Sequence, residues 1–131
     1  MKYNIIVFIC IFSLISCRKD CITTCPDNEI TTCIVGTWVE THRNEGYGNP
    51  LEPVENGRTL IFHDSHNFSV RLKNSTTNCS GKYLLNDEEK KIKFDSDCYK
   101  HEYVIVSFDS DKLQLGIMGR HGLAISQYSK N

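Results

Sequence analysis

The side chains of this sequence that are best suited to chemistry are its seven cysteines and five histidines. Histidine and thiolate are common ligands of zinc and copper, so their spacing tests for a metal site. His63 and His66 fall in one polar turn, which favours solvated side chains, and His42, His101 and His121 have no spacing that forces them together. Nucleophile motifs and phosphate-binding loops are also missing. The sequence therefore predicts no metal, no cofactor and no enzymatic activity.

Cys79 and Cys98 flank two segments of alternating polarity that are joined by the polar turn 87–90. Folding this segment as a hairpin pairs three sets of residues on one face: Leu85 with Ile92, Tyr83 with Phe94, and Cys79 with Cys98. Opposed positions on one face bring two β-carbons close enough for a disulfide. We therefore predict a disulfide between Cys79 and Cys98.

The N-terminus has the pattern of an export signal. Lys2 is followed by an apolar run over residues 5–15 of about eleven residues, which suits a signal peptide and is too short to span a bilayer. The run ends at Leu14-Ile15-Ser16-Cys17, which resembles the lipobox of bacterial lipoproteins. The resemblance implies cleavage before Cys17, lipidation of its thiol and a cell-envelope location, on the outer membrane with a periplasmic or a surface face. An ordinary secretory signal with an incidental cysteine is the alternative.

The expected division is a signal peptide at 1–16, a lipidated Cys-rich tether at 17–33 and one domain at 34–131. In the tether, Cys21, Cys25 and Cys33 are odd in number, which predicts one pair and one free thiol without saying which. The formal net charge of −1, without a basic stripe, argues against nucleic acid as a partner. We expect a monomer.

Short alternating runs follow one another from residue 34 onward, separated by turn residues. The sequence predicts eight strands, at 37–43, 58–63, 67–73, 79–86, 91–96, 101–108, 112–118 and 122–128. Most connections are short hairpin links, and only the first, 44–57, is long enough for a crossover. Eight strands that pair in this way leave two exposed edges unless they close. We therefore predict an all-β, antiparallel up-and-down barrel.

The first strand begins with Gly36-Thr37-Trp38, which resembles the Gly-x-Trp motif that opens lipocalins and shorter lipocalin-like bacterial lipoproteins. The resemblance implies a basic residue over the tryptophan, and Lys130 is placed for that role. The lipocalin acid and tyrosine between the sixth and seventh strands are matched only by Asp109 and Asp111, without the tyrosine. This departure leaves a protease-inhibitor-type barrel as an alternative.

An eight-stranded barrel is just wide enough to be filled by side chains or to hold one small ligand. Five large rings are expected inside, those of Trp38, Phe62, Phe68, Tyr83 and Phe94. They predict a packed lumen with at most a shallow pocket at the mouth, where the first, third, fifth and seventh links meet. The candidate ligand-binding residues are Tyr47, Leu51 and Val54 in the first link and Tyr83 and Phe94 in the lumen.

The sequence thus predicts a membrane-anchored, non-enzymatic binding module that takes a small apolar ligand or a protein partner at the barrel rim. A protease-inhibitor role, or a structural role in the envelope, is the alternative.

Overall fold

The structure is a computed structural model that describes residues 30–63, 66–72 and 75–131. The expected signal peptide, the lipidation site Cys17, and Cys21 and Cys25 lie outside the described residues. Within the described part, no helix is long and apolar enough to cross a membrane.

The described chain contains one short helix and nine strands. They are α1 (Ile30–Cys33), β1 (Gly36–Arg43), β2 (Glu52–Pro53), β3 (Thr59–Phe62), β4 (Asn67–Arg71), β5 (Asn78–Asn86), β6 (Lys91–Asp95), β7 (His101–Phe108), β8 (Lys112–Gly119) and β9 (Gly122–Lys130). All of the predicted strands are present, with ends that differ by one or two residues. The ninth strand, β2, was not predicted; it is a two-residue strand in the first link.

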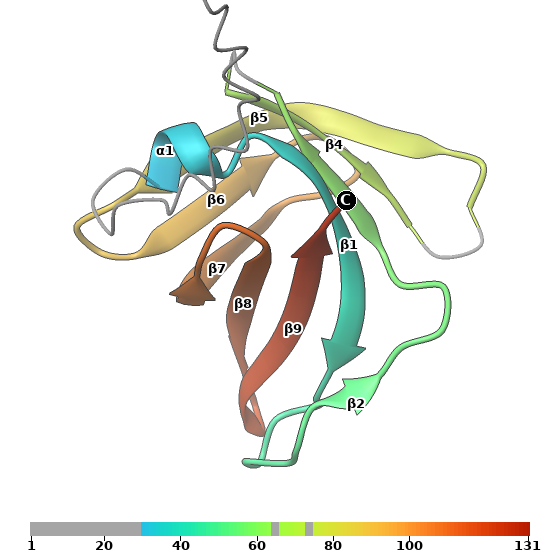
Figure 1. The fold of residues 1–131 in the computed structure, drawn as a ribbon, viewed down its shortest axis with the longest axis vertical. Helices are drawn as coiled ribbons and strands as arrows, with labels where there is room; N and C mark the ends of the chain where they lie inside the picture. The colour runs from blue at the N-terminus through green and yellow to red at the C-terminus, as the bar shows by residue number, and fades with distance from the viewer. Residues whose placement is uncertain (1–29, 64–65, 73–74) are drawn as a thin grey trace, which may run out of the picture.

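The strands form one antiparallel sheet in the order β2-β1-β3-β4-β5-β6-β7-β8-β9, and β1 also pairs with β9. That last pairing closes the sheet, with Trp38 opposite Lys130 and Arg43 opposite Ser126. The predicted eight-strand up-and-down barrel is therefore confirmed, and Figure 1 shows its strands curling round until the red β9 lies beside the teal β1.

The first link does not run free as a long loop. Its β2 strand pairs with the end of β1, His42 opposite Pro53 and Arg43 opposite Glu52. Val54 N then donates to Thr41 O at 2.9 Å. The pairing of β2 with β1 extends the wall of the barrel at one end, which we call the mouth (Figure 1).

The two-residue period of the strands places one apolar face inward. All five rings predicted for the lumen are buried, each with at most 5% of its surface exposed: Trp38, Phe62, Phe68, Tyr83 and Phe94. They pack mainly edge-to-face, as Phe62 does on Tyr83 with ring centroids 5.1 Å apart. The lumen is therefore a packed core over most of its length.

The end opposite the mouth is covered by α1, and we call it the closed end (Figure 1). Ile30 of α1 is 4% exposed and belongs to the core. Trp38 Nε1 donates to Ile34 O at 2.7 Å, and Lys130 Nζ lies 5.2 Å from the centroid of the Trp38 ring. The basic residue over the tryptophan is thus present, as the lipocalin resemblance implies.

The last residues of the expected tether, 30–33, lie against the barrel. Residues 30–33 form the helical turn of α1, and Thr31 Oγ1 donates to Asp87 Oδ2 at 3.0 Å. The absence of any period in so short a segment hid the helix, although Ile30 and Ile34 are four residues apart and lie on one helix face. Cys33 takes part in a disulfide, so it is not the free thiol of its group.

The β5–β6 hairpin has the predicted register, with Tyr83 opposite Phe94 and Leu85 opposite Ile92. A disulfide joins Cys79 to Cys98, whose α-carbons are 5.9 Å apart. Gly81 is needed where β5 passes the end of β6, because a β-carbon there would lie 2.4 Å from Asp95 O. The disulfide ties the link between β6 and β7 to the wall of the barrel.

Candidate ligand-binding site

The mouth of the barrel contains an open pocket of about 410 Å³. Its lining is Arg43, Asn44, Arg58, Leu72, Tyr103, Leu115, Ile117, Ala124 and Ser126. The apolar members come from β8, β9 and the end of β4, and the charged members come from β1 and the residue before β3. The pocket therefore has apolar walls and a charged floor.

Strand alternation places the charged floor. Glu40 follows the inward-facing Trp38 by two residues, and Arg58 precedes the inward-facing Leu60 by two, so all four share the inner face. Gly57 lets the two strands approach, because a β-carbon there would lie 2.1 Å from Glu40 O.

A bulge in β1 brings Arg43 to the same site. The register of β1 against β9 shifts between Glu40 and His42, which moves the alternation by one residue. As a result Arg43, rather than His42, reaches Glu40 and lines the pocket.

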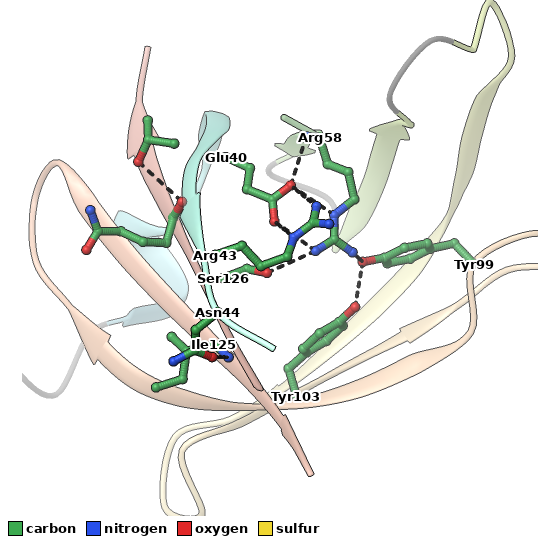
Figure 2. A network of polar contacts seen from close by, with 10 residues as sticks. Glu40, Arg43, Asn44, Arg58, Tyr99, Tyr103, Ile125 and Ser126 are labelled. Carbon is green, nitrogen blue, oxygen red and sulfur yellow. Dashed lines mark hydrogen bonds and ion pairs between the residues drawn. The ribbon is translucent and has the colours of Figure 1, made fainter. Parts of the chain in front are cut away.

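The Glu40 carboxylate faces the guanidinium groups of both arginines (Figure 2). Arg43 donates to it from Nε at 2.9 Å and from Nη2 at 2.7 Å. Arg58 donates from its backbone N at 3.0 Å, from Nε at 3.2 Å and from Nη2 at 3.0 Å. The carboxylate thus accepts five hydrogen bonds, and its side chain is 0% exposed.

This arrangement keeps Glu40 ionised. Burial alone would raise its pKa, but the hydrogen bonds from Arg43 and Arg58 outweigh burial and lower the pKa to about 2. The same contacts raise the pKa of Arg58 against the opposing effect of burial, and they raise the pKa of Arg43. All three groups are therefore charged at neutral pH.

Two tyrosines separate the charged floor from the aromatic core. Arg58 Nη1 lies 3.5 Å from Tyr99 Oη, which is 2.8 Å from Tyr103 Oη (Figure 2). The Tyr99 ring, 4% exposed, packs on Phe94 with centroids 5.5 Å apart. Burial raises the pKa of Tyr99, so its hydroxyl keeps its proton and can serve as a hydrogen-bond donor.

The rim of the mouth is fixed by backbone contacts. Asn44 Oδ1 accepts from Ile125 N at 2.7 Å, and Asn44 N donates to Ile125 O at 2.9 Å (Figure 2). Tyr47 N donates to His121 O at 2.9 Å, and the two rings stack with centroids 4.7 Å apart. The first link is thereby tied to the β8–β9 turn.

Of the sequence-predicted ligand-binding residues, the structure brings together only Tyr83 and Phe94, which are cross-strand neighbours, and none of the five lines the mouth pocket. Tyr47 is 69% exposed on the rim, and Leu51 is half-buried in the first link. Val54 lines a separate recess of about 480 Å³ beneath that link. Phe94 is 0% exposed within the core, and Tyr83 lines another open pocket, of about 400 Å³, at the end covered by α1, together with Thr31 and His66.

The recess beneath the first link is a weaker candidate than the mouth pocket. Apart from Arg43 and Asn44 it is lined by residues of the link itself, including Glu45 and Glu52, and by no side chain of the aromatic core. In residues 30–63, 66–72 and 75–131, no group of three or more His, Cys, Asp or Glu side chains is arranged to hold a metal ion.

Sequence reasoning missed Glu40, Arg43, Arg58 and Tyr99. A signal for two of them was available, because Glu40 and Arg58 lie two residues from Trp38 and Leu60 on strands already assigned. Charged residues at inward positions break the alternation of polar and apolar residues, and such a break marks a functional site. The bulge that turns Arg43 towards Glu40 has no comparable signal in the sequence.

Comparison with known proteins agrees with this architecture. A family model described as a lipocalin-like domain matches residues 34–115, which is more than half of the chain. A comparison with curated proteins finds no significant match, and a comparison with solved structures finds none either. The matched segment begins before the Gly-x-Trp motif and ends in β8. Together with the closed barrel, this match shows that the chain belongs to the lipocalin-like domain family.

Proposed function

We propose that the mouth pocket binds one small molecule with an apolar body, and that the protein is a non-enzymatic binding module. One observation carries the proposal: the pocket of about 410 Å³ is open at the mouth of the barrel, above a core of buried aromatic rings. This volume lies within the range of about 300–1,000 Å³ that is typical of small-molecule sites.

The walls of the pocket support an apolar ligand. Ile117 and Leu72 remain 36% and 37% exposed at the mouth, and Leu115 and Ala124 lie beside them in the lining. Apolar surface that stays open to water in a concave site is a source of binding free energy, at about 25 cal/mol per Å² buried. The polar floor below would fix the orientation of the ligand.

The test is a calorimetric titration of the purified domain with octanol, an uncharged amphipathic probe. We expect saturable binding that is lost or at least about tenfold weaker in Ile117→Gln. Met118→Gln is the matched control, because Met118 is the next residue, is 74% exposed and does not line the pocket. Equal binding by both variants, or no binding by the unmodified protein, would overturn the proposal.

Native mass spectrometry of the protein from its own host complements the titration. A co-purifying small molecule that is lost from Ile117→Gln would support the site. A protein co-purifying in its place, with the pocket empty, would favour a protein partner at the rim or a protease-inhibitor role.

We also propose that the protein is anchored in the cell envelope through lipid on Cys17. The proposal is based on the Leu14-Ile15-Ser16-Cys17 pattern after an apolar segment with a positive start. In a bacterial host, Cys17→Ala is expected to move the protein from the detergent phase to the aqueous phase, or to leave the signal uncleaved. Cys10→Ala, within the same apolar segment, is the control. Unchanged membrane fractionation of Cys17→Ala with the signal still cleaved would refute the anchor.

A further inference from the structure

We propose that the ligand of the mouth pocket carries a carboxylate, which Arg43 binds at the floor with support from Arg58. This inference rests on the proposed function, since it names the chemical class that the same pocket selects.

The charge balance of the floor is the first argument. One buried carboxylate, Glu40, faces two guanidinium groups, so the cluster carries one net positive charge. The carboxylate is 0% exposed, whereas the side chains of Arg43 and Arg58 are 43% and 19% exposed and line the pocket. A ligand in the pocket therefore meets the guanidinium groups and not the acid.

The unused hydrogen-bond donors are the second argument. A guanidinium has five N–H donors. Arg43 donates to Glu40 from Nε and Nη2, and its Nη1 makes no hydrogen bond within the described residues. Arg58 by contrast is engaged through Nε and Nη2 by Glu40 and through Nη2 by Ser126 Oγ, at 3.0 Å. Arg43 is therefore the residue that is free to bind a further acceptor.

The rigidity of the floor is the third argument. Glu40 fixes both guanidinium planes through paired hydrogen bonds, so the donors are oriented before a ligand arrives. A preorganised planar donor suits a planar carboxylate and lowers the entropy cost of binding it. Tyr103 and Ser126, which also line the pocket, add hydroxyl groups beside the arginines.

Other charges near the site do not cancel this preference. Glu45 and Glu52 share the recess beneath the first link with Arg43, but both are exposed and neither forms an ion pair with it within the described residues. Charges in contact with water are screened more strongly than those in the pocket. The field at the floor is therefore set mainly by Glu40, Arg43 and Arg58.

The experiment compares three probes with the same alkyl chain and different heads: octanoate, octanol and octylammonium. Calorimetry at neutral pH should show that octanoate binds at least about tenfold more tightly than octanol, and that octylammonium binds most weakly. In Arg43→Gln the floor becomes neutral, so octanoate and octanol should bind within about twofold of each other. Arg43→Lys keeps the charge without the planar donor and should retain part of the preference.

Arg120→Gln is the matched control, because Arg120 is an exposed cation in the β8–β9 turn at the same mouth and does not line the pocket. Its preference for octanoate should stay within about twofold of that of the unmodified protein. Equal affinity of the unmodified protein for octanol and octanoate would overturn the carboxylate inference and leave the apolar site standing. A preference that survives Arg43→Gln would overturn the role of Arg43, and failure of all three probes to bind would overturn the proposed function as well.

Discussion

The two ends of the barrel differ in the side chains that lie on the inner face of the strands. At the closed end, aromatic rings fill the space between the strands, and α1 covers them. At the mouth, the inner face carries Glu40 and Arg58 instead, and water reaches the apolar residues around them. Because strands such as β1 and β9 run through both ends, much of the difference arises from which side chains occupy the inward positions.

The difference suggests that residues at one end stabilise the fold and residues at the other end recognise a ligand. Burial of the rings stabilises the fold without directional requirements, whereas a buried ion pair gains little net stability because desolvation offsets the attraction. Four hydrogen bonds to one carboxylate instead hold two guanidinium groups in a fixed orientation. We infer that the closed end supports the fold and that the mouth is organised for binding.

Removal of a central ring should give the largest loss of stability. Phe94 is 0% exposed and contacts rings from four other segments, so Phe94→Ala leaves a cavity that the neighbours cannot fill. The expected loss in the free energy of unfolding is about 3–5 kcal/mol, measured by urea denaturation. Leu84→Ala on the outer face, where Leu84 is 67% exposed, should cost less than about 0.5 kcal/mol. Similar losses in both variants would show that the lumen is not the core.

Removal of the acid at the mouth should have the next largest effect. Glu40→Gln leaves Arg58 partly buried without its counter-charge, at an expected cost of about 3 kcal/mol in the free energy of unfolding. The folded-state pKa of Glu40, about 2, is below its ordinary value of 4.5, so its stabilisation is fully present above pH 4.5. That stabilisation is lost as the pH falls from 4.5 towards 2.

Urea denaturation at several pH values tests whether the stabilisation by Glu40 is lost as the pH falls. The difference in free energy between the unmodified protein and Glu40→Gln should narrow as the pH is lowered through that window, while other carboxyl groups contribute equally to both proteins. Glu45→Gln is the control, because Glu45 is exposed and makes no ion pair within the described residues. A difference that does not change with pH would mean that Glu40 is not the ionised partner of the arginines.

Removal of the disulfide at the mouth should lower the free energy of unfolding slightly less than removal of the acid does. The Cys79→Ser, Cys98→Ser double variant opens a loop with a sequence separation of 19, which is expected to cost about 2–3 kcal/mol. Tyr99 follows Cys98 directly and forms the boundary between the core and the floor, so the loss should be centred on the mouth. Trp38, the only tryptophan, lies at the closed end, and its native fluorescence should stay the same. A changed emission would show that the two ends are coupled.

Much of the fold was predictable because its causes are local in the sequence. The period of two along each run, and the short links between runs, determine the strand order and the pairing of neighbours. The register of the β5–β6 hairpin follows from its turn, and it places Tyr83 opposite Phe94. Closure follows from the need to avoid two open edges.

The candidate site was not predictable in the same way, because it depends on contacts between distant segments. Glu40 and Arg58 are 18 positions apart, and their contact requires the close approach of strands at Gly57. Arg43 joins them only because of the bulge in β1. Tyr99 enters the lumen from a link, where no strand period indicates its direction.

The smallest expected effect concerns Lys130, a cation at the closed end that contacts an aromatic ring and a carbonyl oxygen. Lys130 Nζ lies over the Trp38 ring and donates to Cys33 O at 2.9 Å, and burial lowers its pKa. Lys130→Met keeps the apolar stem but removes the charge and the hydrogen bond, so we expect a loss of about 1 kcal/mol in the free energy of unfolding. The Trp38 emission should shift as well, because the charge above the ring is gone.

Two further variants decide whether the charge or the stem matters at this position. Lys130→Arg keeps a cation over the ring and should retain most of the stability, whereas Lys112→Met, at an exposed position of β8, should change neither stability nor emission. If Lys130→Met and Lys130→Arg are equally stable, the charge contributes nothing, and the closed end is held by packing alone. In that case the contrast between the two ends would be sharper, because Lys130 would have no electrostatic role while Glu40 and the arginines form the floor of the pocket at the mouth.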